Sequence, residues 1–388
     1  MNNPQRLKIL LFAQLPPPYH GTTLMHQLII ESDFTKVFDV HTQLINFADR
    51  VEDITGKFSL KKIFRLISYL IQTFQKLISN RFDYCIYPIT FTAGPFLRDA
   101  ALLSVVRLFG VKIIYYAHGN HLPDFRDRSP KWLQKLIDNF FNAAAGAIVV
   151  GECLKFNFSR YLPVTRILAV HNAAERLTPV DISLKTKKPD TLQVLYLSNF
   201  IRSKGVFVLL ESIPKIIPFY PNVHFVFAGG WRSKSDEQEA LDFVRNNNLQ
   251  PYVTWKGVVT GETKSRLFYE SDIFVFPTFY PTETFGVVNL EAMQAGLPII
   301  TTNHAAIPEV VEDGINGFII PTQNSDAIAE KVILLCKNPE LRAFMRENNI
   351  KKYESFYTRE KFGERLIEAV EQLHASICGA EQFFKVLP

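Results

Sequence analysis

Two carboxylates with a distinctive spacing lie in the second half of the chain. Glu283 and Glu291, with seven residues between them, belong to the run 272–298, DIFVFPTFYPTETFGVVNLEAMQAGLP. A carboxylate accepts hydrogen bonds from two hydroxyls, which suits the vicinal diol of a ribose or the ring hydroxyls of a sugar. The pair therefore predicts a site for a nucleotide or a sugar. The alternative is structural: a carboxylate at a helix start and another on a solvated face.

The residues around this pair predict a helix that begins beside Glu283. The helix begins near Phe285 and ends at Gly296, because glycine commonly terminates helices and Pro298 follows directly. Its first residues, which include Gly286 and Val287, would present free N–H groups and a positive dipole end to a phosphate oxygen. Gly286 would also let a ligand approach the backbone closely.

Two further loops of the second half have residues suited to a nucleotide. The run YLSNFIRSKG leads from a predicted strand into a helix and carries Arg202 and Lys204, cations that suit a diphosphate. For Arg202 a solvated surface charge is the alternative. The run FAGG at 227–230 ends another strand, so that Gly229 and Gly230 form either a ligand-lining loop or an ordinary turn.

The first half offers one histidine and one glycine at comparable places. His118 follows the predicted strand 112–116, and Gly21 lies between the first strand and the next helix. Open α/β sheets bind ligands at the carboxyl ends of their strands, which makes both residues site candidates. A core histidine and an ordinary turn glycine are the alternatives.

The second half resembles retaining glycosyltransferase family 4, enzymes of the GT-B fold marked by a Glu, seven residues and a second Glu. The likeness extends beyond Glu283 and Glu291 to Pro277, to Glu-x-Phe-Gly and to LEAMQAGLPII. It continues in HAAIPEVVEDGINGFII at 304–320. This resemblance implies transfer of a sugar from a nucleotide-diphosphate donor with retention of configuration, by front-face attack and without an enzymatic nucleophile.

The resemblance also implies roles for the residues of the second half. Glu291 would bind the ribose hydroxyls, and Glu283 would lie against the transferred sugar near its reacting carbon. The backbone of 285–287 would hold donor hydroxyls and phosphate. Lys204 would meet the diphosphate, and Gly229 and Gly230, with the region of Gly257, would line the base.

Two positions of the chain depart from the family pattern, and a third position, in the first half of the chain, agrees with it. Many members have an arginine five residues before the lysine, where this chain has Asn199, so that Arg202 is left as the second cation. Many have two glycines in the loop where this chain has only Gly21. His118 matches the family's histidine near the transferred sugar.

The elements that must position these residues alternate between strands and helices. This alternation predicts an α/β protein of the GT-B fold, with two doubly wound Rossmann-like domains facing a central cleft. We expect an acceptor-binding domain at 1–178, a nucleotide-sugar-binding domain at 179–356 and a C-terminal helix at 357–388 that packs back towards the first domain. The stretch 175–190, with two prolines and mixed charge, is the predicted linker.

Bulk composition excludes several classes of protein. Of 388 residues, 47% are hydrophobic and 21% charged, which is typical of a globular chain long enough for two cores. The four cysteines are far apart and form no metal-ligand pattern, which favours a reducing compartment and predicts no metal site. We expect 7–13 to be a strand and not a signal peptide. No run reaches the roughly 18 apolar residues of a membrane span, so we expect no integral membrane protein.

Charge is uneven along the chain. Residues 1–180 hold 21 Lys and Arg against 13 Asp and Glu, a net +8 within a total of +5. A basic first half predicts an anionic partner, and the absence of a reader motif disfavours nucleic acid. The stretch 56–82 interleaves basic and large apolar residues. It predicts either a basic amphipathic helix on an anionic membrane or a helix whose apolar stripe packs on the sheet.

Together these observations predict a metal-independent hexosyltransferase without a cofactor, in which the nucleotide sugar is a substrate. The expected acceptor is a glycan or lipid-linked glycan of cell-surface polysaccharide synthesis, such as lipopolysaccharide or capsule. The expected location is the cytoplasm, including the inner face of the membrane. A GT-B epimerase or hydrolase and a non-catalytic binding module are the alternatives. A dinucleotide dehydrogenase is disfavoured, because no Gly-x-Gly-x-x-Gly follows the first strand.

Overall fold

The computed structural model describes residues 6–17, 21–47, 60–180 and 191–386. The chain divides into two compact units. Unit 1 comprises 1–172 together with 359–388, and unit 2 comprises 173–358. The sequence placed these boundaries at 178 and 356. Most of the predicted linker, 181–190, lies outside the described residues, as do the first residues of the basic stretch 56–82.

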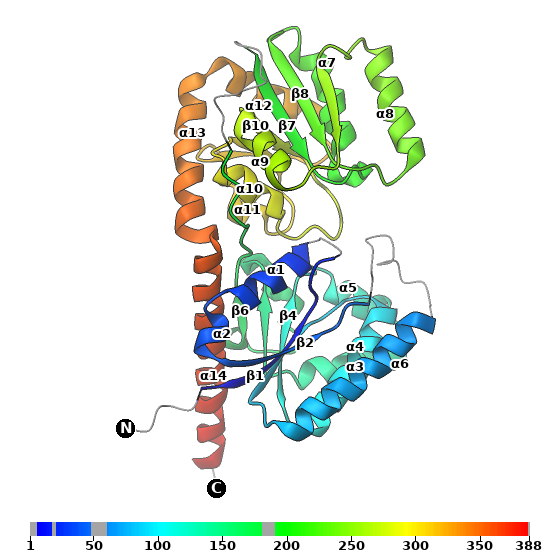
Figure 1. Ribbon diagram of the computed structural model, residues 1–388, viewed down its shortest axis with the longest axis vertical. Coiled ribbons are helices and arrows are strands. Elements are labelled where there is room, and N and C mark those ends of the chain that lie inside the picture. The colour runs from blue at the N-terminus through cyan, green and yellow to red at the C-terminus, as the bar shows by residue number, and fades with distance from the viewer. Residues whose placement is uncertain (1–5, 18–20, 48–59, 181–190, 387–388) are drawn as a thin grey trace. The chain divides into compact units, whose positions relative to one another are not determined.

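Unit 1 contains a parallel sheet of six strands in the order β2-β1-β3-β4-β5-β6 (Figure 1). The strands are β1 (Lys8–Ala13), β2 (Asp39–Leu44), β3 (Tyr84–Pro88), β4 (Lys112–Ala117), β5 (Gly146–Val149) and β6 (Ile167–Ala169). The helices are α1 (Gly21–Glu31), α2 (Phe34–Val37), α3 (Leu60–Ser79), α4 (Ala93–Leu108), α5 (Leu122–Arg128), α6 (Lys131–Asn142) and α14 (Arg359–Val386).

Unit 2 also contains a parallel sheet of six strands, in the order β12-β11-β10-β7-β8-β9. The strands are β7 (Leu192–Leu197), β8 (Val223–Ala228), β9 (Val253–Gly257), β10 (Ile273–Phe276), β11 (Ile299–Thr302) and β12 (Gly317–Ile320). The helices are α7 (Val206–Ile216), α8 (Lys234–Asn246), α9 (Gly261–Glu270), α10 (Val287–Gln294), α11 (Ile307–Val310), α12 (Ser325–Lys337) and α13 (Pro339–Lys352).

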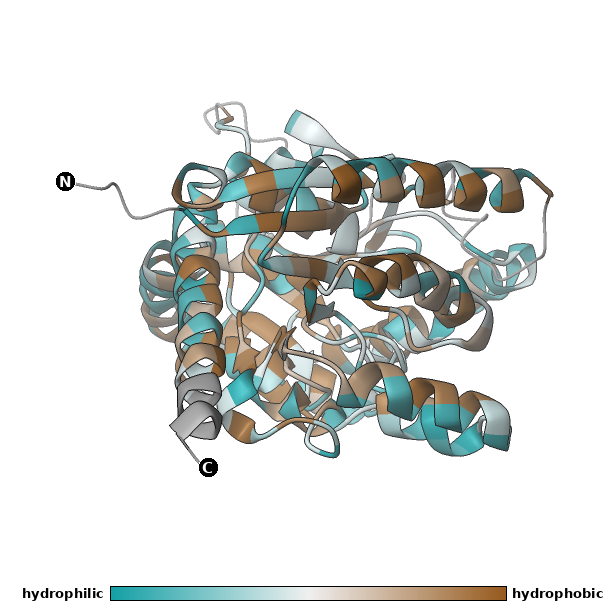
Figure 2. Cartoon of the chain, turned by 90° about the horizontal axis from the view of Figure 1, so that it is seen from below, coloured by the Kyte–Doolittle hydropathy of each residue, from teal (hydrophilic) through white to brown (hydrophobic). Residues whose placement is uncertain are grey.

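The strands are nearly continuous apolar runs because helices cover both faces of each sheet. In β1, every residue from Ile9 to Ala13 is fully buried, and so are Ile273, Phe274 and Val275 of β10. The covering helices are amphipathic. Figure 2 shows hydrophobic and hydrophilic residues alternating along α14, the helix that leads to the C-terminus. The predicted doubly wound architecture is confirmed for each unit.

The last helix, α14, belongs to unit 1, although it follows unit 2 in the sequence. Leu366, Val370 and Leu373 of this helix are buried. The Leu373 side chain fills the space beside Gly146 of β5, where an added Cβ would come within 2.7 Å of it. The Tyr84 hydroxyl and His374 Nδ1 are joined by a 2.9 Å hydrogen bond.

Helix α3 packs in an unexpected orientation. Only Thr73 and Leu77 of this helix are buried, whereas large apolar residues on its other face are exposed. The expectation that its apolar stripe packs on the sheet is therefore wrong for that face. The sequence predicts one apolar face along this helix, but the helix is rotated so that the side holding the polar Thr73 packs inward.

Candidate active site

The candidate site of unit 2 lies where the order of its strands reverses. β7 and β10 are hydrogen-bonded neighbours, but the chain continues from β7 towards β8 and from β10 towards β11, on opposite sides. The carboxyl ends at such a reversal of strand order are the usual ligand site of an open α/β sheet. Lys204 follows β7 and Glu283 follows β10, so the topology brings them to the same point.

Lys204 and Glu283 form an ion pair with 2.6 Å between Nζ and Oε2. Their side chains are only 18% and 15% exposed. The other carboxylate oxygen of Glu283 accepts a hydrogen bond from the Gly286 N–H at 3.2 Å. The ammonium also lies 5.1 Å from the centre of the Tyr280 ring. Glu283 therefore links a cation to the start of α10, and these groups can face an anionic ligand together.

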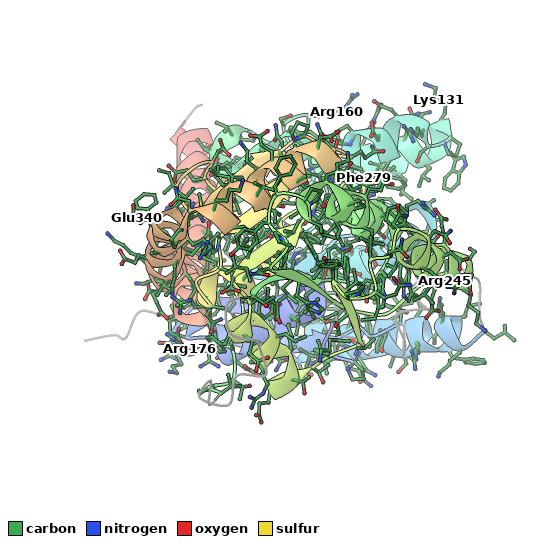
Figure 3. All side chains as sticks on the ribbon, turned by 90° about the horizontal axis from the view of Figure 1, so that it is seen from above. Lys131, Arg160, Arg176, Arg245, Phe279 and Glu340 are labelled. Atoms are coloured by element: carbon green, nitrogen blue, oxygen red, sulfur yellow. The ribbon has the colours of Figure 1, made fainter. Side chains whose placement is uncertain are left out.

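The backbone around this pair is fixed by close contacts. The Tyr196 hydroxyl donates to the Lys204 carbonyl at 3.1 Å, and burial raises the pKa of Tyr196 so that it stays protonated. Phe279, labelled in Figure 3, donates its N–H to the Ser203 carbonyl at 2.8 Å. The loops after β7 and β10 are thus held together without a ligand.

Two glycines in this region are required by their backbone conformation. Gly205 has φ +87°, and an added Cβ would lie 2.2 Å from the Pro277 carbonyl oxygen. Gly286 has φ +66° and precedes α10, which begins at Val287 and not at Phe285 as predicted. Only glycine adopts this left-handed conformation at low cost. The conformation sets the direction in which α10 begins. Phe285 itself is buried.

Glu291 has its own lysine partner. Lys264, in the first turn of α9, donates a hydrogen bond from Nζ to Glu291 Oε1. The sequence reasoning missed Lys264, because it lies outside the 272–298 run and belongs to no motif. The two predicted carboxylates are thus each paired with one lysine, and both pairs belong to unit 2.

Gly229 and Gly230 lie where the loops after β7, β8 and β9 meet. Gly229 donates its N–H to the Gly257 carbonyl at 2.8 Å, and the Gly230 carbonyl accepts from Phe200 at 2.8 Å. An added Cβ at Gly229 would lie 1.8 Å from the Ser198 carbonyl oxygen. Trp231 packs beside these glycines, 4.8 Å from the Phe200 ring between centroids.

Arg202 is engaged on the surface. Its guanidinium pairs with Asp236 and Glu239 of α8 and lies 4.0 Å from the centre of the Phe207 ring. The hydrogen bond to Glu239 is the main cause of its raised pKa. Lys204, and not Arg202, is therefore the cation joined to the predicted carboxylate.

The unit 1 residues gather at the carboxyl ends of β1 and β4. The His118 ring lies 4.4 Å from Tyr116 and 5.9 Å from His26, measured between centroids. His26 is fully buried in α1, and its Nδ1 accepts a hydrogen bond from the Gln14 N–H at 3.1 Å. No motif or spacing singles out His26, which occupies an ordinary helix position. Gly21 is the first residue of α1 and has open space where a side chain would be.

Among the described residues, no three His, Cys, Asp or Glu side chains are grouped as a metal ion would require. None of the described helices combines the length and the apolarity needed to cross a membrane.

Comparison with solved structures defines the class of fold. HepE of Anabaena, solved with UDP, has a TM-score of 0.70 at 17% identity and covers 94% of this chain and 99% of its own. Sucrose-phosphate synthase of Thermosynechococcus elongatus has a TM-score of 0.72 at 15% identity, covering 96% of this chain and 100% of its own. The chain therefore has the GT-B fold, as the sequence predicted.

Comparison of sequences gives a family match within unit 2 and several relatives of part of the chain. Residues 181–352 match the family model of the glycosyl transferases group 1. Spore coat protein SA of Bacillus subtilis is 32% identical over 186 residues, 46% of this chain and 48% of the relative. The capsular polysaccharide biosynthesis glycosyltransferase CapM of Staphylococcus aureus is 28% identical over 180 residues, 46% of this chain and 45% of the relative. The matched part spans about half the length of these curated relatives.

Proposed function

We propose that this protein is a retaining glycosyltransferase that moves a hexose-type sugar from a nucleotide-diphosphate donor to a glycan or lipid-linked glycan acceptor. One observation carries the proposal: two Lys–Glu pairs and the N-terminus of α10 occupy the switch-point end of the unit 2 sheet. Paired carboxylates suit sugar and ribose hydroxyls, while lysines and a helix start suit a diphosphate. The match to a glycosyltransferase family model over the same unit supports this proposal.

In the proposed complex, Lys204 and the N–H groups at 285–287 stabilise the donor diphosphate. Glu291 accepts hydrogen bonds from the ribose hydroxyls, and Glu283 faces the transferred sugar. Gly229 and Gly230 line the base, and His118 of unit 1 faces the transferred sugar. Arg202 would contribute a second cation only after leaving its two carboxylates.

The proposed reaction needs no enzymatic nucleophile. The bond between the anomeric carbon and the diphosphate oxygen breaks, and the acceptor hydroxyl oxygen forms its bond on the same face. The hydroxyl proton passes to the departing phosphate, which keeps the charge balanced. Lys204 and the dipole of α10 stabilise the negative charge that develops on the diphosphate. We propose that these protein groups replace a metal ion and that no cofactor takes part.

We further propose a role in cell-surface polysaccharide synthesis, at the cytoplasmic face of the membrane. The relatives that include CapM support this cell-surface role. UDP, the nucleotide present in the HepE crystal, is the first donor nucleotide to test.

The test is transfer of a radiolabelled sugar from a panel of nucleotide sugars to an alcohol acceptor, with and without EDTA. We expect one donor to give a glycoside with the donor's anomeric configuration, at an unchanged rate in EDTA. Release of free sugar or of an epimer without transfer would instead identify a hydrolase or an epimerase. Absence of nucleotide binding by calorimetry would contradict the proposal and favour a non-catalytic module.

A further inference from the structure

Helix α3 of unit 1 presents a row of large apolar side chains to solvent. The row comprises Leu60, Phe64, Ile67, Ile71, Phe74 and Ile78. The spacing alternates between four and three, so the six side chains form one stripe along a single helix face. Their exposure runs from 47% at Ile67 to 71% at Phe64. The full length of the helix therefore carries an apolar surface that nothing in the described chain buries.

The opposite face of α3 holds the helix on unit 1. Leu77 is buried there, the Tyr69 hydroxyl donates to the Asn46 carbonyl at 2.9 Å, and Lys76 Nζ donates to the Thr42 carbonyl at 2.6 Å. Burial lowers the pKa of Lys76. Because these contacts fix the rotation of α3, the stripe is directed outward by the fold.

The apolar surface continues onto the end of α4. Phe109 lies with its ring centroid 5.6 Å from that of Phe74 and is itself exposed. Leu108, its neighbour, is 83% exposed, the highest value among the large apolar side chains of the described residues. We call α3 together with Leu108 and Phe109 the α3 face.

The charges within residues 60–82 have a single sign. Residues 60–82 contain Lys61, Lys62, Arg65, Lys76 and Arg81 and no Asp or Glu. The one acidic residue of α4, Asp99, is fully buried, where it accepts hydrogen bonds from Arg98 and from the Tyr87 hydroxyl. Residues 60–82 thus combine an apolar stripe with basic residues and no acidic residue of their own.

We propose that the α3 face docks on the headgroup region of an anionic lipid bilayer. The apolar stripe enters the boundary between headgroups and acyl chains, and basic side chains of residues 60–82 other than Lys76 meet lipid phosphates, as in interfacial helices. A second copy of the chain fits less well, because two α3 faces would bring cations together with no acidic partners on residues 60–82. The charge complementarity favours the bilayer.

The test is sedimentation of the full chain with vesicles of phosphatidylcholine alone or mixed with phosphatidylglycerol. We expect binding to the mixed vesicles, little binding to the neutral ones and release at high salt. The variant Phe64→Ser/Ile67→Ser/Ile71→Ser should bind at least about tenfold more weakly. Arg81→Gln should weaken binding to the mixed vesicles alone. Thermal unfolding would check that each variant folds, and the single variant Phe64→Ala provides a milder change.

A matched control removes an equally exposed aromatic from the other unit. Phe344→Ser in α13, where the ring is 48% exposed, should leave vesicle binding unchanged. Equal loss in Phe344→Ser, or no binding of the wild type at low salt, would overturn the proposal. So would a dimer in analytical ultracentrifugation that Phe64→Ser/Ile67→Ser/Ile71→Ser abolishes while vesicle binding persists. No donor is present in these experiments, so their outcome is independent of the proposed transfer activity.

Discussion

The two units use the same kind of sheet and place different chemistry at its carboxyl end. In unit 2, Lys204–Glu283 and Lys264–Glu291 form two ion pairs beside the start of a helix. In unit 1, the corresponding end of the sheet holds the rings of His26, Tyr116 and His118. One end is built from compensated charge and the other from rings in edge-on and tilted contact.

This difference indicates how each sheet end would select a ligand. The paired charges already have fixed orientations. The diphosphate of a nucleotide sugar can take the place of a carboxylate beside a lysine, and its ribose and sugar hydroxyls can take the place of a lysine beside a carboxylate. Neither partner of a pair is then left unsatisfied. Of the three rings, His26 and Tyr116 are buried and only His118 is partly exposed, so His118 is the ring that could contact a sugar or glycan acceptor. The comparison therefore predicts that charge substitutions in unit 2 act on the donor and ring substitutions in unit 1 act on transfer.

The largest expected effect tests the charge half of this comparison. Glu283→Gln keeps the shape of the side chain and removes its charge, so we expect turnover to fall by about 100- to 1000-fold. Donor nucleotide affinity, measured by calorimetry, should change less than it does in Glu291→Ala, because Glu283 is assigned to the sugar. Unchanged turnover in Glu283→Gln would refute its role.

The next effect concerns stability and compares one glycine from each unit. Gly205→Ala would force a Cβ against the Pro277 carbonyl at a positive φ, so we expect a loss of about 2 to 4 kcal/mol in unfolding free energy. Gly21→Ala has open space and should unfold as the wild type does. Denaturant titration compares them. Equal stability of both variants would mean that the close approach in unit 2 is not a constraint.

The ring half of the comparison is tested by His118→Ala. We expect turnover to fall by about tenfold to a hundredfold, because one polar group and one ring face are lost. Nucleotide affinity should stay within about twofold of the wild type, since the proposed donor site belongs to unit 2. His41→Ala, a partly exposed histidine of β2, is the control. A large loss of nucleotide affinity in His118→Ala would contradict the assignment of donor binding to unit 2 alone.

The smallest expected effect concerns Lys264. Lys264→Met keeps much of the side-chain length and removes the partner of Glu291, so we expect nucleotide affinity to fall by about five- to tenfold. Lys215→Met removes a comparable surface pair with Asp326 and should leave affinity unchanged. Calorimetry with the preferred nucleotide distinguishes the two. If both variants bind alike, the second ion pair is structural only.

The fold and half of the candidate site could be predicted because their signals are local. Strand and helix periodicity predicted both sheets, and one continuous run contains Glu283, Gly286 and Glu291. Lys264 was missed because its partner is distant in sequence and only the packing of α9 brings them together. Helix α10 begins at Val287 and not near Phe285, as predicted, because Gly286 adopts a left-handed conformation. A glycine permits this conformation but does not require it.

The outward stripe of α3 and the burial of His26 were beyond the reach of sequence for another reason. Periodicity predicts one broad apolar face for α3, but the packed side includes the polar Thr73 and much of the apolar face is exposed. A polar residue such as His26 is expected on the exposed side of a helix. In α1 its side chain instead lies inward, beside Gln14. In both cases tertiary packing decides the orientation.

The return of the chain from unit 2 to unit 1 sets an order of events during synthesis. On a ribosome, residues 1–172 emerge first but lack α14, whose Leu373 covers Gly146 of β5. Unit 2 is continuous and is fully translated before that helix appears. We therefore expect the nascent first unit to stay incomplete, with this part of its sheet bare, while the second unit folds. A chaperone that binds apolar surface would find its target in that interval.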